Sequence, residues 1–583
     1  MGTVVTSFVS DLKERFTPYT EWLGDLKNPE ILKADLLAGL TVALVLIPQS
    51  MAYADLAGLP AYAGLYASFL PAIIAALFGS SRQLATGPVA VVSLMTASTL
   101  GSLGITDTTT FVMYAGMLAL MVGIFQLSLG LLRLGVLVDF LSHPVVVGFT
   151  NAAAIIIASS QVSKLFGIDV DKGDHHYETM WNLVTSLAQT HMPTVVMALF
   201  ALFLLIFIKR INPKLPSVLI AVVITTLLSW GLDFESMGGA VVGVVPEGLP
   251  DFTIPAIDFV HFKDLLVAAV IIALLGFVEA ISVAKAIAAE TRQRLSANQE
   301  LVGQGLANLS SGMFGGYPIS GSFSRSAVNF AAGGRTGYSS IVTGILVALT
   351  LLFLTPLLYH LPQPTLAAVI VMAVVNLVKF EPIKHAWKVE RHDGIVAIVV
   401  FVVTLFFAPH LEMGIMAGVL LSLGLFLYRT MSPKFVEVAR HKDGTLRNAE
   451  LFNLKTSDSL SIYRFDGDLY FANAGYLEGK FLNSLAAKPN TKAIILDLES
   501  VDQIDATGEE TLSRILERLI AADIAFYIAR GRKPVLDAFK RSGLYNKIGE
   551  ENFFRERTNA SKYAKKQLGD AVDITPILKS IPR

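Results

Sequence analysis

One arginine in this chain stands where a lipid bilayer should exclude charge. Arg325 lies within residues 316–334, GYPISGSFSRSAVNFAAGG, between apolar runs long enough to span a membrane. Gly321 interrupts the apolar pattern, and Ser320 or Ser322 is suited to cap a helix that begins at mid-membrane depth. The start of such a half-span exposes unpaired N–H groups and about half a positive charge. Together with Arg325 it predicts an anion-binding site inside the membrane.

A second interruption of this kind occurs earlier in the chain. Each apolar half of the sequence contains a third segment that is short and broken by glycine and proline. In the first half this is residues 85–93, where Pro88 fits the first helical position after a cap at Thr86 or Gly87. Paired interruptions at corresponding places indicate a transporter's substrate site between inverted repeats. Glycine-rich packing kinks are the alternative, but kinks alone leave Arg325 unexplained.

Glu279 is a carboxylate inside the apolar run of residues 275–284. An intramembrane carboxylate is costly, so it is expected to carry a proton or cation, or to pair with a buried cation. The structural alternative is a fixed ion pair with Arg325 that only joins two helices. The sequence leaves both alternatives open.

Gln49 and Tyr53 lie four residues apart in the first apolar run, which places them on one helix face. An amide and a phenol can donate hydrogen bonds to an anion without adding a charge that would trap it. The alternative is that Gln49 satisfies a carbonyl group freed by Pro48 or by the broken helices.

Composition defines the class of protein. Hydrophobic residues make up 53% of the 583 and charged residues only 16%, which indicates a polytopic membrane protein. A net charge of -1 argues against a nucleic-acid partner. Cysteine is absent, which excludes disulfides and thiolate metal sites. We find no phosphate-binding glycine loop and no histidines at metal-protease spacing. We therefore expect no enzyme activity, cofactor or metal.

The apolar segments set the topology. About fourteen can be placed in residues 33–431, the expected all-α transmembrane domain, if broken helices count as segments. Lysine and arginine gather in alternate loops, which predicts the orientation in the cell (inner) membrane. The N-terminal segment, residues 1–32, and the C-terminus are both expected to lie in the cytoplasm.

Near residue 432, charged residues become frequent and the apolar runs shorten to the length of strands. This change predicts a small cytoplasmic α/β domain over residues 432–557. The tail, residues 558–583, is polar and expected to be poorly ordered, although residues 574–581 could dock. The patterns predict strands at 459–465, 469–471, 492–498 and 524–529, and helices at 508–522 and 534–542.

Thr507 and Glu510 have the spacing of a helix capping box, so the simplest interpretation of this loop is structural. Regulatory phosphorylation at Thr507 is the second interpretation.

Together these residues resemble a known family, the SulP sulfate permeases, whose animal relatives include pendrin and prestin. The resemblance covers most of the chain and ends in a domain similar to the STAS domain of these proteins. The motifs that carry it are residues 47–53 (IPQSMAY), 61–66 (AYAGLY), 79–82 (GSSR), 86–88 (TGP) and 322–326 (SFSRS).

The resemblance implies a homodimer with a seven-plus-seven inverted-repeat fold, in which a mobile core domain moves like an elevator against a gate domain. The family's anion lies between two facing helix ends, which here match Gly87, Pro88 and Val89 on one side and Ser322, Phe323, Ser324 and Arg325 on the other. Gln49 and Tyr53 match positions beside that site. Glu279 matches an acidic position that is associated with proton coupling when it is glutamate and that is part of a sodium site in bicarbonate-carrying members.

The expected function is secondary active transport of a small anion across the lipid bilayer, with proton-coupled sulfate uptake favoured. Bicarbonate or dicarboxylate transport, or anion exchange, on the same fold is the alternative. A non-transporting sensor that signals through the STAS domain is the alternative from another class.

Overall fold

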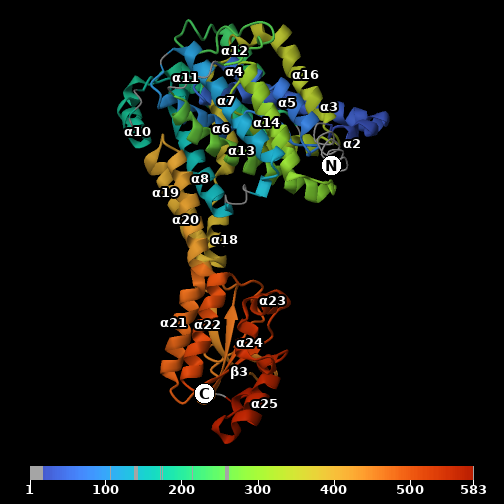
Figure 1. Ribbon diagram of the computed structural model, residues 1–583. Coiled ribbons are helices and arrows are strands. Elements are labelled where there is room, and N and C mark those ends of the chain that lie inside the picture. The colour runs from blue at the N-terminus through green and yellow to red at the C-terminus, as the bar shows by residue number, and fades with distance from the viewer. Residues whose placement is uncertain are drawn as a thin grey trace. The chain divides into compact units, whose positions relative to one another are not determined.

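The computed structural model describes residues 17–105, 107–136, 142–170, 173, 175–212, 215–255 and 261–581 (Figure 1). The chain divides after Ser422 into two compact units, a helical one and one that contains a sheet. The first half of the expected N-terminal segment, residues 1–16, lies outside the described residues. The remainder of that segment contains α2 (Thr20–Leu23) and the 3-10 helix η1 (Gly24–Lys27).

The helical unit has the expected all-α polytopic character. Among the described residues, seven helical segments are long and apolar enough to cross a membrane, and four helices of 10–17 residues are also apolar. The first half contains α3 (Pro29–Leu56), α4 (Ala61–Tyr66), α5 (Leu70–Phe78), β1 (Ala85–Gly87), α6 (Ala90–Gly101), α7 (Thr108–Leu131), α8 (His143–Ser160), α9 (Val162–Phe166), α10 (His176–Thr185), η3 (Leu187–Gln189), α11 (Met192–Ile211) and α12 (Ser217–Gly231). The second half contains α13 (Phe262–Thr291), α14 (Ala297–Met313), β2 (Ser320–Ser322), α15 (Phe323–Ala331), α16 (Tyr338–Phe353), η4 (Thr355–Leu358), α17 (Gln363–Val374), η5 (Val375–Leu377), α18 (Glu381–Val389), α19 (Arg391–Phe407) and the first part of α20 (Glu412–Met431), which continues past Ser422 into the second unit.

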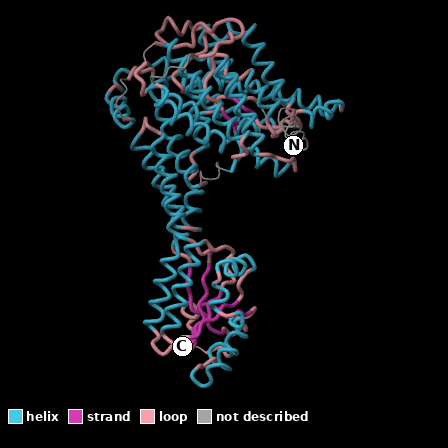
Figure 2. The backbone as a smooth tube through the Cα atoms, viewed as in Figure 1, coloured by secondary structure: helices cyan, strands magenta, loops and turns pink. Residues whose placement is uncertain are grey.

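The two interrupted segments meet in the folded chain. Each is a three-residue strand followed by a short helix, β1 then α6 and β2 then α15. The strands pair antiparallel, with Ala85 opposite Ser322 and Gly87 opposite Ser320, and Figure 2 shows this small sheet in magenta inside the helical unit. Because the pairing is antiparallel, α6 and α15 leave the sheet in opposite directions and both N-termini lie beside it.

The two half-helices begin differently. Ser322 is the N-cap of α15, and its Oγ accepts a hydrogen bond from the Arg325 backbone N–H at 3.4 Å, as the sequence predicts. The expectation that Pro88 takes the first helical position is wrong. Val89 is the N-cap of α6, and Pro88 precedes it. The reason is the pairing with β2, which keeps Thr86 and Gly87 in extended backbone and delays the helix.

Two long helices enclose the half-helices, since α3 and α13 each contact both α6 and α15. Glycine permits the close approach of α13 to β2. A Cβ atom on Gly321 would lie 2.9 Å from the Cβ of Ala280, and one on Gly276 would lie 3.3 Å from the Cβ of Ser320. A larger residue at Gly321 would therefore push α13 away from the sheet.

Buried amides of α14 fix the two strands. The side chain of Asn308 accepts a hydrogen bond from the Ile319 backbone N–H at 2.8 Å and donates one to the Ile319 carbonyl oxygen at 3.1 Å. Gln304 Nε2 donates to Thr86 Oγ1 at 2.8 Å. The two bonds of Asn308 satisfy the irregular backbone before β2, and the bond of Gln304 holds the Thr86 side chain of β1, so groups of the protein hold both interruptions.

The second unit is built on a six-stranded sheet in the order β4-β3-β5-β6-β7-β8, in which β5 to β8 are parallel and β3 is antiparallel to both neighbours. Alternate strand residues pack on opposite faces, with Ile494 and Leu496 against α21 to α24, and Ala493 and Ile495 against α25 and α26. The elements are β3 (Lys434–Arg440), β4 (Leu446–Asn448), β5 (Leu460–Asp466), α21 (Phe471–Ala487), β6 (Ala493–Asp497), α22 (Ala506–Ala521), β7 (Ala525–Ala529), α23 (Lys533–Ser542), α24 (Leu544–Ile548), η6 (Glu550–Asn552), β8 (Phe553–Phe554), α25 (Arg557–Leu568), η7 (Gly569–Ala571) and α26 (Thr575–Leu578).

Most elements predicted in this unit are present, with shifts of a few residues. The strand predicted at 469–471 is wrong, because Tyr470 is the N-cap of α21 and Phe471 begins that helix. The tail is also better ordered than predicted. It contributes α25 and α26, whose Ala560, Ala564 and Ile577 are buried against the sheet.

The capping box predicted at Thr507 is wrong as well. Asp505 caps α22, and its Oδ1 accepts a hydrogen bond from the Gly508 backbone N–H at 2.8 Å. Thr507 is an exposed residue of the first turn. Aspartate accepts N-terminal N–H groups as readily as threonine, so it can take the cap two residues earlier.

Candidate anion-binding site

Arg325 is fully buried in the first turn of α15, with an exposed fraction of 0%. Its Nη2 donates a hydrogen bond at 2.8 Å to the carbonyl oxygen of Pro88, which directly precedes the N-cap of α6. Its Nε and Nη1 have no hydrogen-bond partner. Among the described residues no carboxylate oxygen lies within 4.0 Å of this guanidinium. Donors of this kind, buried and unused, are suited to the oxygen atoms of an anion.

The residues that precede and cap α6 form the other side of the site around Arg325. Gly87, Pro88 and Val89 are all buried. A Cβ atom on Gly87 would lie 3.4 Å from Arg325 Nη2, so glycine leaves the guanidinium room at this point. The two helix N-termini and Arg325 thus bring three sources of positive potential to the small sheet.

Three other titratable side chains lie in the surroundings of Arg325. They are Tyr53 from α3, Tyr317 from the segment before β2, and Glu279 from α13. Glu279 is half-buried and forms no ion pair with Arg325 in this structure. The alternative in which the two residues are a fixed pair that joins their helices is therefore not what the geometry shows.

Gln49 is buried beside Tyr53 on α3, with an exposed fraction of 6%, and its Oε1 has no partner. The alternative role, satisfying a carbonyl freed by Pro48, is not observed, because within the described part of the chain Gln49 makes no hydrogen bond. Its amide is available to a ligand, and the assignment of Oε1 and Nε2 can exchange by a flip of the side chain.

Phe323 and Ser324 are exposed, unlike the rest of the predicted set. Phe323 is 59% exposed, although it directly follows the buried cap residue Ser322. The first turn of α15 therefore has one exposed side, with Phe323 and Ser324, and one buried side, which holds Arg325.

Sequence reasoning missed Tyr317. It is fully buried, and its hydroxyl forms a 3.1 Å hydrogen bond with Ser93 Oγ of α6, which is a second link between the two halves of the helical unit. A phenol directly before Pro318 in the interrupted segment was the available signal, because a tyrosine at mid-membrane depth needs a polar partner.

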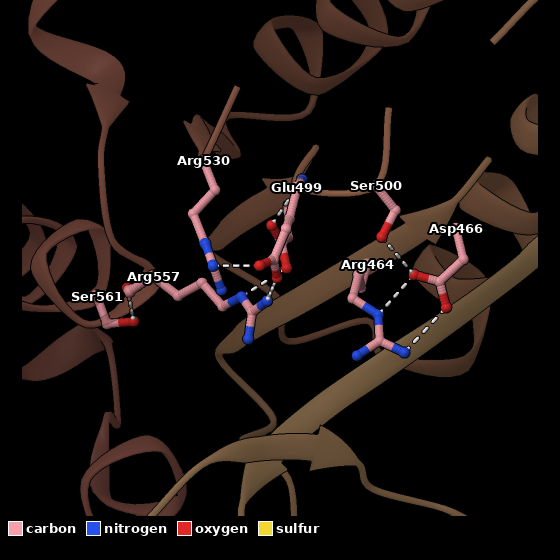
Figure 3. Close-up of polar contacts among 8 residues, drawn as sticks. Arg464, Asp466, Glu499, Ser500, Arg530, Arg557 and Ser561 are labelled. Atoms are coloured by element: carbon pink, nitrogen blue, oxygen red, sulfur yellow. Dashed lines mark hydrogen bonds and ion pairs between the residues drawn. The ribbon is translucent and has the colours of Figure 1, made fainter. Parts of the chain in front are cut away.

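The second unit also contains a dense polar cluster, at the carboxyl edge of its parallel strands (Figure 3). Arg557 of α25 forms ion pairs with Asp497 at 2.5 Å and Glu499 at 2.6 Å. Glu499 also pairs with Arg530, and Arg464 pairs with Asp466 at 2.7 Å. The positive and negative groups of this cluster pair with each other, so they neutralise one another. The pairs of Arg557 hold α25 against the sheet.

Comparison with known proteins decides the family. Residues 32–400 match the profile of the Sulfate permease family, and residues 452–560 match that of the STAS domain. The chain belongs to the sulfate permease family. Among other sulfate permeases, "Sulfate transporter 4.1, chloroplastic" of Arabidopsis thaliana is 35% identical over 557 residues, which cover 92% of this chain and 81% of that protein. A protein named as a probable sulfate transporter of Mycobacterium tuberculosis is 34% identical and covers 90% of this chain and 93% of its own.

Solved structures show the same fold for this sulfate permease. The murine Solute Carrier 26 family member A9 anion transporter, in an inward-facing state, superimposes with a TM-score of 0.88 at 23% identity, covering 96% of this chain and 95% of its own. The transmembrane domain of the cyanobacterial bicarbonate transporter BicA gives a TM-score of 0.57 at 25% identity, covering 66% of this chain and 97% of its own. The helical unit therefore has the fold of membrane anion transporters.

Proposed function

We propose that this protein is a secondary active transporter of a small oxyanion, that sulfate is its substrate, and that a proton is its coupling ion. One observation carries the proposal: the fully buried Arg325 has two unpartnered nitrogens at the place where the N-termini of two half-helices meet. A buried charge without a protein partner costs several kcal/mol, and an anionic ligand removes that cost. The names of the relatives support sulfate as the anion.

The charge balance of the site favours a divalent anion. Arg325 supplies one positive charge, and the two helix N-termini supply about half a charge each, which sums to about two. Glu279 changes this balance, because it subtracts one charge when ionised and none when protonated. A sulfate ion and a proton on Glu279 should therefore each favour the binding of the other, which is the linkage that symport requires.

Gln49, Tyr53 and the N–H groups around Val89, Ser322 and Ser324 are assigned as neutral donors to the anion. They orient oxygen atoms and add no net charge, so the anion can leave again. Phe323 is assigned to the exposed side of the site.

Several wider features belong to the same proposal. We assign residues 33–431 to transport and residues 432–557 to the STAS domain, with the tail, residues 558–583, as part of the same folded unit. Because β1 and β2 tie both half-helices together, the site is suited to move as one body, as in an elevator mechanism. A homodimer in the cell membrane with both termini in the cytoplasm completes the arrangement.

Uptake into proteoliposomes tests the function. Purified full-length protein should accumulate radiolabelled sulfate under an inward proton gradient, and the Arg325→Ala variant should not. Unlabelled bicarbonate and dicarboxylates added in excess define the selectivity. Uptake of bicarbonate or a dicarboxylate in place of sulfate would change the substrate, and no flux of any of these anions would favour the sensor.

A further inference from the structure

Lys379 is a second cation at the exposed side of α15. It lies between η5 and α18, is exposed, and its ammonium group lies 6.0 Å from the centre of the Phe323 ring. Phe323 is the first residue of α15, two positions before Arg325. A segment more than fifty residues later in the chain thus brings a positive charge to the exposed side of the same helix turn.

The backbone of Lys379 is held firmly in this place. Asn151 of α8, which is 1% exposed, accepts a hydrogen bond from the Lys379 backbone N–H at 2.7 Å and donates one to its carbonyl oxygen at 3.1 Å. The same amide nitrogen also donates to the Val147 carbonyl oxygen at 2.8 Å. A buried amide that satisfies both backbone groups of one residue positions that residue in advance of any ligand.

The ammonium group of Lys379 has no acidic partner in the described part of the chain, within the 4.0 Å limit of an ion pair. Its neighbour Lys384 differs, because its ammonium lies 3.7 Å from Glu381. Unpaired charge at Lys379 is therefore available to a solute, whereas that of Lys384 is partly compensated.

We propose that Lys379 is the outer cation of the anion pathway, which attracts the anion to the exposed side of α15 before it reaches Arg325. This inference rests on the proposed function and adds a residue to it. An anion that approaches Arg325 from the exposed side of α15 passes Phe323 and Ser324, and the Lys379 ammonium stands above that ring. An ammonium group is a compact charge on a flexible stem, which suits transient capture better than fixed coordination.

The position of Lys379 predicts which kinetic constant it controls. It is exposed and does not reach the buried guanidinium, so its charge acts on the encounter with the anion and on weak binding. Such attraction decreases as ionic strength rises, because exposed charges are screened. Lys379 should therefore lower the KM for sulfate without changing the maximal rate.

Initial rates of radiolabelled sulfate uptake test the inference in proteoliposomes that contain the full chain. In low-salt buffer, Lys379→Gln should raise the KM about two- to fivefold, the range of an exposed charge pair, with the maximal rate unchanged. Lys379→Arg should restore the wild-type KM. Lys384→Gln is the matched control on α18 and should leave the KM unchanged. Added potassium gluconate should raise the wild-type KM toward that of Lys379→Gln.

The outcomes separate this inference from the proposed function. If the wild-type protein transports sulfate and the KM is the same in Lys379→Gln and in Lys384→Gln, the role of Lys379 is overturned and the transport function stands. A lower maximal rate of Lys379→Gln at unchanged KM would also overturn this role, because it would mean that Lys379 acts through a structural contact with Phe323. A wild-type protein without anion flux would overturn the proposed function, and the inference with it.

Discussion

Arg325 in the helical unit and Arg557 in the sheet-containing unit are both buried arginines, yet their surroundings are opposite. Arg557 pairs with two carboxylates, Asp497 and Glu499, and lies at the first position of α25. Among the described residues, no carboxylate lies within 4.0 Å of the Arg325 guanidinium, and two of its nitrogens have no hydrogen-bond partner. Both occupy the start of a helix, where the helix dipole disfavours a cation.

The comparison separates a structural arginine from one that is kept for a ligand. A buried ion pair holds two elements together, and removing one partner leaves the other charge unsatisfied. A buried cation without a protein partner destabilises the folded state unless something else neutralises it. The difference predicts that stability depends on Arg557 and that ligand binding depends on Arg325.

Replacing Arg557 should have the largest effect on stability. Arg557→Met leaves Asp497 buried and unpaired and should destabilise the second unit by on the order of 3–5 kcal/mol. Hydrogen exchange at the amides of α25 in the full-length protein measures this. The control is Arg532→Met, since Arg532 forms an ion pair with Asp502 that is half-exposed. Equal exchange in the two variants would remove the distinction between the two arginines.

Replacing Arg325 should weaken anion binding and leave the ligand-free protein at least as stable as wild type, because a buried charge without a partner is removed. Arg325→Met should cost about 1.5–3 kcal/mol of sulfate binding, the range for hydrogen bonds to charged groups. All four tryptophans, at positions 22, 181, 230 and 387, precede Ser422, so their fluorescence follows the helical unit during heating. The rise in melting temperature with sulfate should disappear in Arg325→Met and persist in Arg335→Met, where an exposed arginine is removed.

Glu279 sharpens the comparison, because it is the acidic residue in the surroundings of Arg325 that could act as its structural partner. Glu279→Gln imitates the protonated carboxyl group, so sulfate should still bind while uptake no longer depends on the proton gradient. Uptake measured with and without the gradient checks this. If either single change lowered the melting temperature and Arg325→Met with Glu279→Gln restored it, the two residues would be a structural pair and the contrast with Arg557 would fail.

The smallest effect concerns pH. Burial raises the pKa of the Asp497 carboxyl group, although the Arg557 guanidinium acts in the opposite direction. A folded-state pKa above the unfolded value means that the folded protein binds more protons, so this contribution to stability is complete at low pH and is lost as pH rises through the folded-state pKa. The stability of wild type relative to Asp497→Asn should therefore decrease from acidic to neutral pH. Hydrogen exchange at α25 over that range is the measurement, and a difference that increases with pH would contradict it.

The sequence was most informative where a residue violates its surroundings. Arg325 was found because the bilayer excludes charge, and Ser322 because a helix start requires a cap. The pairing of β1 with β2 could not be predicted, since three-residue strands have no periodicity. For the same reason the start of α6 was placed two residues too early, at Pro88.

Contacts between distant segments also could not be predicted from the sequence. Nothing in the sequence around Lys379 indicates that Asn151 and Phe323 are its neighbours. In the second unit, the N-terminus of α21 was taken for a strand because Leu469, Tyr470 and Phe471 are apolar and aromatic, which is typical of strands. The sequence does not predict α25, because its buried apolar residues, Ala560 and Ala564, are small and few among charged residues, and Tyr563 packs on the sheet only partly buried.

The pairing of β1 with β2 has a consequence for biosynthesis. Ala85 is translated about 235 residues before Ser320, and the hydrogen bonds of each strand exist only when both are present. At about 5–20 residues per second this interval lasts roughly 12–47 s, during which β1 would sit in the membrane with unpaired backbone groups. Lipid cannot satisfy such groups. The first half of the chain must therefore wait in contact with water or the insertion machinery, and the membrane fold is completed only after the second half has been made.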